Sequence, residues 1–146
     1  MKTYMILIPV ILIAAASVFQ TEVKCVFAPE RAVEKNISFS VYKTSSYNSA
    51  VYSNTSAQVH IIVEKVRGNI RTKVWEQTLD AKQLSQYPTI QQAMTQTIKV
   101  PGVHEKKERI EVSYTLTYDS QGSTLQMQGG TVMTECCDSD KLDITI

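Results

Sequence analysis

The stretch Arg109–Asp119 reads RIEVSYTLTYD and has the clearest periodicity in the chain. Its apolar and aromatic residues alternate with polar ones without a break, and they are Ile110, Val112, Tyr114, Leu116 and Tyr118. Side chains on a strand point to opposite faces with a period of two, so the pattern predicts one apolar face and one solvent-exposed face. We therefore expect the central strand of an antiparallel sheet that packs on a core with one face only.

Other segments with strand character precede and follow this stretch. They are Asn36–Lys43, Gln58–Arg67, Ile70–Leu79, Thr95–Val100, Thr124–Met133 and Lys141–Ile146. Gly68-Asn69 separates two of them, and this pair favours a tight hairpin because both residues tolerate positive φ. Trp75 is the only tryptophan, and we expect it to fill the core.

Several residues indicate where the strands are interrupted. Asp80–Tyr87 has the pattern of one helical turn with Asp80 as its N-cap, and Pro88 would end it. Pro101-Gly102 predicts a turn. Gly129-Gly130 predicts a bulge or kink within its strand.

These features together predict an all-β fold, an antiparallel β-sandwich of about seven strands. The turn signals have the spacing of a sandwich, and neither a sustained helical period nor an internal repeat is visible. Without alternating helices and strands, a parallel sheet is not expected. In general architecture the pattern is similar to immunoglobulin-like and fibronectin type III-like domains, although no motif assigns the chain to a family.

The first 20 residues have the three-part layout of a secretory signal peptide. Lys2 gives a positive start, a mostly apolar run covers Tyr4–Ala16, and Ala14-x-Ala16 offers a cleavage site with small residues. We expect a cleavable signal peptide over residues 1–20 and a single domain over residues 21–146. The protein would then be secreted, or would reach the periplasm or the cell surface in a bacterium.

Two other interpretations of the N-terminus compete with this one. For an uncleaved membrane anchor, the apolar run is shorter than the roughly 20 residues that span a bilayer, and Pro9 interrupts it. A bacterial lipoprotein acylated at Cys25 would need small residues before the cysteine, whereas Glu22, Val23 and Lys24 stand there. We therefore expect no membrane span after signal cleavage.

Length and charge restrict the range of partners. The 146 residues carry 15 basic and 14 acidic side chains, a net charge of +1, and loss of Lys2 with the signal peptide leaves a neutral domain. A neutral domain lacks the basic surface that attracts phosphate backbones or anionic lipids. We therefore expect no nucleic-acid binding.

The three cysteines are Cys25, Cys136 and Cys137. Export places them in an oxidising compartment, and their odd number leaves one without a partner inside the chain. We expect a disulfide between Cys25 and either Cys136 or Cys137. The alternatives are a Cys136–Cys137 bond or three free thiols. No Cys or His partners stand at the spacing of a zinc site.

Residues 44–57 read TSSYNSAVYSNTSA and contain no charge. Tyr offers rigid amphipathic contact area, and Ser and Asn offer adaptable hydrogen bonds, a mixture that is common on recognition loops. The candidate binding residues in and beside this segment are Tyr42, Tyr47, Asn48, Tyr52 and Asn54. The alternative interpretation is an ordinary surface loop or irregular edge strand.

The sequence carries no catalytic signature. It contains no G-x-S-x-G, H-E-x-x-H or P-loop pattern, so we expect neither an enzyme nor a cofactor. His60 and Glu64 share a strand face and are the one pair that suggests a metal ligand set. A solvated strand face explains the pair equally well, so no metal site is predicted.

The function expected from these features is an exported, non-catalytic binding or adhesion module that recognises a protein or a glycan through the Ser/Tyr/Asn-rich loop. An alternative is a structural or assembly subunit that pairs through an edge strand such as Leu142–Ile146. A third possibility is a secreted inhibitor that presents a loop to a protease.

Overall fold

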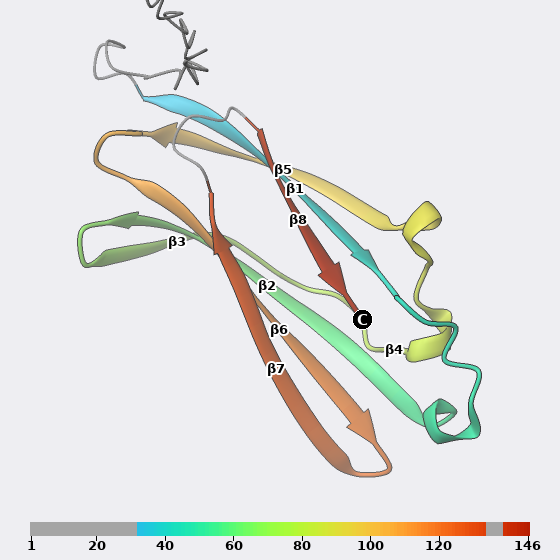
Figure 1. The fold of residues 1–146 in the computed structure, drawn as a ribbon. Coiled ribbons are helices and arrows are strands. Elements are labelled where there is room, and N and C mark those ends of the chain that lie inside the picture. Colours follow the sequence, from blue (N-terminus) through green and yellow to red (C-terminus); the bar gives the residue numbers. More distant parts are fainter. Residues whose placement is uncertain (1–31, 134–138) are drawn as a thin grey trace, which may run out of the picture.

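A computed structural model describes residues 32–133 and 139–146 of the chain, which form an all-β fold of two sheets (Figure 1). The three-stranded sheet has the order β5 (Met94–Val103), β1 (Val33–Tyr42), β8 (Ser139–Thr145). The five-stranded sheet has the order β3 (Ile70–Thr78), β2 (Thr55–Arg67), β6 (Arg109–Ser120), β7 (Ser123–Val132), with β4 (Lys82–Gln83) also paired to β2. Three short 3-10 helices are η1 (Ala50–Tyr52), η2 (Leu84–Gln86) and η3 (Ile90–Gln92).

Strand β6 has the one-sided burial that its alternation predicts. Ile110, Val112 and Leu116 are buried, and the two tyrosines of the same face are half-buried against the same core. On the opposite face Arg109, Ser113 and Asp119 are exposed, and the other polar residues are half-buried. β6 lies between β2 and β7, so it is an internal strand of the larger sheet.

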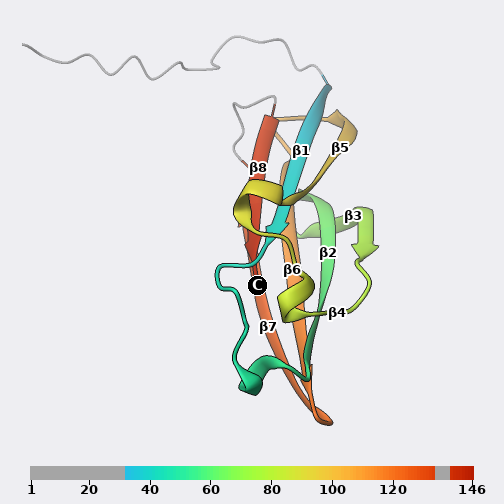
Figure 2. The same ribbon diagram turned by 90° about the vertical axis from the view of Figure 1, so that its right-hand side faces the viewer.

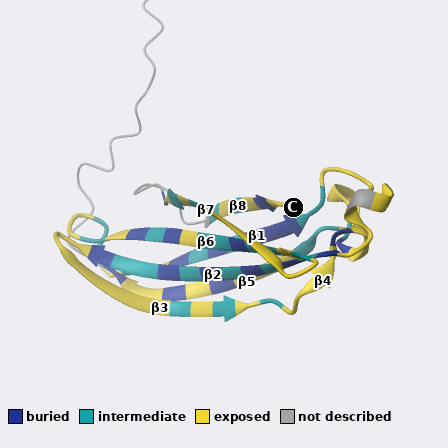
Figure 3. Cartoon of the chain, turned by 90° about the horizontal axis from the view of Figure 1, so that it is seen from below, coloured by how far each residue is buried: buried dark blue, intermediate teal, exposed yellow. Residues whose placement is uncertain are grey.

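Apolar residues of both sheets belong to one core cluster. Ile37, Phe39 and Val41 come from β1, and Val59, Ile61 and Val63 come from β2. The rings of Phe39 and Trp75 stack with their centroids 5.3 Å apart and their planes 12° apart, which joins β1 to β3 across the two sheets. Figure 3 shows buried residues alternating with more exposed ones along both strands. Trp75 is half-buried and packs against the core without being enclosed by it.

Two hairpins of the larger sheet have two-residue turns. The β2–β3 hairpin pairs Arg67 with Ile70, and Gly68 takes a φ of +58°, which confirms the predicted turn. The β6–β7 hairpin turns at Gln121 and Gly122, both with positive φ. Positive φ at the turn matches the twist of the flanking strands, so these turns join them without splaying the sheet.

The predicted turn at Pro101-Gly102 is wrong, because both residues lie inside β5. The register runs from Lys35 opposite Val100 to Val33 opposite Val103, so β5 contains one extra residue at this point. Gly102 has a φ of +66°. A proline without an N–H followed by a glycine at positive φ suits a bulge on an edge strand as well as a turn.

The predicted bulge at Gly129-Gly130 is also wrong. The β6–β7 register is continuous, with Tyr114 opposite Gly129. A Cβ on Gly129 would lie 2.4 Å from atoms of the Tyr114 ring, so the aromatic side chain occupies the place of the missing side chain. Aromatic residues commonly cover a strand glycine in this way.

The segment after β3 does not form the predicted helical turn with Asp80 as its N-cap. It forms the short strand β4 and then η2, whose N-cap is Gln83. Leu84 and Tyr87 are buried, and the Tyr87 hydroxyl donates to the Ala57 carbonyl oxygen over 2.8 Å. Tertiary contacts of these two side chains, together with Pro88, explain why the helical pattern stops after three residues.

One strand pair departs from the predicted antiparallel arrangement. β8 pairs with β1 in parallel, with Asn36 opposite Ser139 and Tyr42 opposite Thr145. A tight hairpin can join only antiparallel strands, and parallel neighbours need a long connection. The connection between β1 and β8 comprises all the other strands, so nothing local fixes the direction of β8.

The signal peptide predicted over residues 1–20 and the cysteines Cys25, Cys136 and Cys137 lie outside the described residues. Within residues 32–133 and 139–146, no helix has the length and apolar character that a membrane crossing requires.

Candidate binding surface

The segment between β1 and β2, residues 43–54, is fixed by bonds to two distant parts of the chain. The Lys43 backbone N–H donates to the Pro88 carbonyl oxygen over 2.8 Å. The backbone N–H and the hydroxyl of Thr44 both donate to the Ile146 carbonyl oxygen, over 3.2 and 3.3 Å. These bonds hold residues 43–54 at the end of the fold that also carries η2 and η3, as Figure 2 shows.

Two tyrosines give this segment a fixed shape. The rings of Tyr47 and Tyr52 meet edge to face with centroids 5.2 Å apart. Such a pair adds about 0.5–1.5 kcal/mol beyond the burial of its area. Tyr47 has a φ of +52°, a left-handed conformation that costs a non-glycine residue of order 1–3 kcal/mol and is concentrated at functional sites. Tyr47 is half-buried against the core, whereas Tyr52 is 41% exposed.

An open depression of about 500 Å³ lies between this segment and the η3 region. Its lining residues are Lys43, Thr44, Ser45, Ser46, Asn48, Thr89, Ile90 and Gln91. Most of them carry hydroxyl or amide groups, which both donate and accept hydrogen bonds without a net charge. A volume of this size falls within the range of small-ligand sites. The depression therefore suits a ligand rich in hydroxyl or amide groups.

The predicted binding residues divide into three groups. Asn48 lines the depression. Tyr47 and Tyr52 contact each other beside it, and neither lines it. Tyr42 and Asn54 belong to neither arrangement. Tyr42 is half-buried at the end of β1, and Asn54 is exposed immediately before β2. Of the five predicted binding residues, Asn48 is therefore the one that lines the depression.

The side chains that sequence reasoning missed are Thr89, Ile90 and Gln91, which line the opposite wall. They are about 40 positions away from Asn48 in sequence, and the Lys43–Pro88 backbone bond brings the two segments together. Ile90 is 59% exposed and is the one apolar side chain in the lining. Neither residues 83–97 nor residues 44–57 contain a charged side chain. This shared property was the sequence signal that could have linked the two walls.

Further tyrosines lie behind the Tyr47–Tyr52 pair. Burial raises the pKa of Tyr118, and the neighbouring Tyr47 and Tyr114 raise it further. Burial, with a smaller effect of Tyr118, raises the pKa of Tyr87 to about 12. These hydroxyls therefore stay protonated at physiological pH and can donate hydrogen bonds, as the Tyr87 hydroxyl does to the Ala57 carbonyl oxygen.

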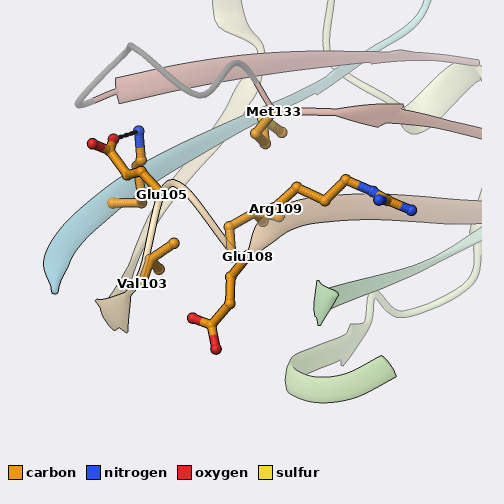
Figure 4. A pocket seen from close by; sticks show the side chains of 7 residues that line it. Val103, Glu105, Glu108, Arg109 and Met133 are labelled. Atoms are coloured by element: carbon orange, nitrogen blue, oxygen red, sulfur yellow. Dashed lines mark ion pairs between the residues drawn. The ribbon is translucent and has the colours of Figure 1, made fainter. Parts of the chain in front are cut away.

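The charged end of the core offers a second, much smaller cavity. Figure 4 shows Glu105, Glu108, Arg109 and Met133 around it, and its volume is about 10 Å³. The Lys35 ammonium, only 6% exposed, lies 2.5 Å from a Glu105 carboxylate oxygen. A cavity of this size holds about one water molecule. We interpret the Lys35–Glu105 ion pair as structural, because it closes this end of the core.

The suggested His60–Glu64 pair does not form. The His60 ring lies 2.9 Å from Glu76 on β3, and the Glu64 carboxylate binds Arg71 instead. Cross-strand partners on the β2–β3 hairpin thus satisfy both side chains. Among the described residues, no group of three or more His, Cys, Asp and Glu side chains is placed to hold a metal ion.

Comparisons with protein-family models, with curated protein sequences and with solved structures gave no match for this chain.

Proposed function

We propose that this chain is an exported, non-catalytic recognition domain that binds a protein or a glycan through the depression between residues 43–48 and 89–91. The observation that carries the proposal is the lining itself, in which hydroxyl and amide side chains from two distant segments surround one space of about 500 Å³. Glycans and peptide backbones present the complementary donors and acceptors.

The two sheets form, in this proposal, a sandwich of the general immunoglobulin or fibronectin type III kind. The shared core cluster and the Phe39–Trp75 stack between β1 and β3 support it. Such domains commonly bind through loops gathered at one end of the strands. Residues 43–54 occupy that position here, and the signal-like residues 1–20 would deliver the domain outside the cell.

Single substitutions in the two walls test the proposal. The purified protein is applied to a glycan array, and in parallel it is immobilised to capture proteins from extracellular fluid. For whichever ligand is retained, Asn48→Ala and Gln91→Ala should each weaken binding by roughly two- to tenfold, the value of one hydrogen bond of about 0.5–1.5 kcal/mol. Thr72→Ala, an exposed position on β3, is the matched control and should bind like the wild type.

Unchanged affinity of both wall variants, or an equal loss in the β3 control, would show that the depression is not the binding surface. Unfolding temperatures of the three variants, measured in the same buffer, separate a loss of binding from a loss of fold.

A further inference from the structure

The described strands of the two sheets have four edges, one of them formed by β3 together with the short β4, and three of the edges carry features that discourage pairing with another chain. β3 has Arg71, Lys73 and Glu76. β5 has Lys99 and the bulge at Pro101. β8 has Asp140, Lys141 and Asp143 within seven residues. Charges, prolines, bulges and short length are the usual means by which sheets protect their edges.

The fourth edge, β7, has none of these features. Its sequence is STLQMQGGTV, ten residues without a charge or a proline, and its register with β6 is continuous. Among the described residues β7 pairs only with β6. Nearly all of its residues are exposed, as Figure 3 shows. The other edges of the same molecule therefore serve as an internal comparison, and β7 alone is suited to accept another strand.

The same strand exposes apolar side chains on the face that it shares with the core. Leu125 and Met127 pair with Tyr118 and Leu116 of β6, whose side chains contribute to the core. Leu125 nevertheless remains 60% exposed and Met127 53% exposed. Side chains directed to the core side of a sheet but left uncovered form an apolar strip along the open edge.

We propose that β7 pairs antiparallel with β7 of a second copy of this chain, which joins the two larger sheets into one. In a two-fold antiparallel contact each residue faces the residue at the same distance on the other side of the axis, so charges of one sign on the strand would face one another. β7 avoids this conflict because it carries no charge. A charged foreign strand would gain no complementary partner here, whereas a second copy can set its small Gly129 opposite the exposed Leu125, and this favours a second copy as the occupant.

The hairpin determines which residues of β7 can bond to a second copy. Ser120 and Ser123 flank the two-residue turn and bond to each other, so alternate residues from Thr124 onward direct their N–H and C=O groups away from β6. We place the two-fold axis at Met127, which pairs Gln126 with Gln128 of the second copy. It also brings Leu125 beside Gly129 of the second copy, where the Tyr114 ring lies.

The expected dimer is weak. Ten residues span about 33 Å, and one added strand pair buries less area than the roughly 1,600 Å² of a standard stable interface. We therefore expect dissociation in the micromolar range, which is measurable by sedimentation velocity between about 1 and 100 µM. The measurement is made with and without a thiol reductant, because a disulfide through the odd cysteine would also link two chains.

Charge reversal gives the decisive test. Gln126→Lys with Gln128→Lys places lysines opposite lysines and should weaken the dimer by at least tenfold, as should the corresponding pair of glutamate substitutions. An equal mixture of the lysine and glutamate proteins should restore the dimer, since each lysine then faces a glutamate. Gln96→Lys, which adds a lysine to the β5 edge, is the control and should dimerise like the wild type.

Restoration in the mixture also proves that both variants fold. A wild-type protein that stays monomeric at the highest concentration overturns the proposal. So does a dimer that disappears with reductant, a dimer that survives the lysine substitutions, or a mixture that remains monomeric. None of these results depends on the ligand of the depression, so this proposal and the proposed function fail separately.

Discussion

At the scale of single residues, Leu116 tests the one-sided burial of β6. Its side chain is buried in the shared core, whereas Thr117 lies on the opposite face. Leu116→Ala removes buried volume and leaves a cavity, so we expect it to lower the free energy of unfolding by about 2–5 kcal/mol. Thr117→Ala should lower it by less than about 1 kcal/mol. Denaturant titration of the two variants measures both values, and equal losses would mean that both faces of β6 are buried.

Tyr87 gives the fold a defined response to alkaline pH. Burial raises its pKa from 10.0 to about 12, so the phenol stays neutral in the folded protein after the unfolded chain has begun to ionise. Its contribution to stability is therefore complete below pH 10 and is lost as the pH rises to 12. Unfolding free energies measured across this window should fall more steeply for the wild type than for Tyr87→Phe. If the wild type and Tyr87→Phe lost stability in parallel over this pH range, the loss would not come from Tyr87.

At the scale of elements, the pairing of β6 with β7 depends on Gly129. A Cβ at this position would lie 2.4 Å from the Tyr114 ring, so Gly129→Ala forces the ring to move and should cost about 1–3 kcal/mol. In a Tyr114→Ala background the same substitution should be nearly neutral, because the ring is absent and alanine is no worse than glycine in a strand. Additive losses in the double-mutant cycle would exclude the proposed contact.

The strands show which sequence signals suffice to predict the fold. The alternations in β1, β2 and β6 predicted their buried faces, because a period of two reports burial directly. Pro101-Gly102 and Gly129-Gly130 were misassigned, because the same residues suit a turn, a bulge or a close aromatic contact. The distinction depends on the neighbouring strand, which a local pattern does not contain.

The candidate binding surface was predictable only in part, for the same physical reason. The composition of residues 44–57 indicated a recognition loop and included Asn48. Its opposite wall, with Gln91, is brought near by the Lys43–Pro88 bond between distant segments. The parallel pairing of β8 with β1 is likewise a long-range choice, with no hairpin to indicate it.

At the scale of the whole molecule, the β1–β8 pair bears on the cysteines. Parallel strands enter a sheet at the same end, so the first residues of β1 and β8, Val33 and Ser139, lie at one end of the smaller sheet. We therefore retain the prediction of a bridge from Cys25 to Cys136 or Cys137, with the other thiol free. Peptide mapping of the exported protein without reductant should find it. A Cys136–Cys137 bond, or a mature chain that lacks Cys25, would refute it.

The central claim is that a ligand contacts the walls of the depression. A photoreactive amino acid placed at Asn48, and separately at Gln91, tests this directly when the protein is irradiated with its ligand or in its native extracellular fluid. Asn48 and Gln91 come from the two opposite walls, and the same label at Thr72 on β3 is the control. We predict the same covalent adduct from positions 48 and 91 and none from position 72. An adduct of equal yield from position 72, or none from either wall, would contradict the account.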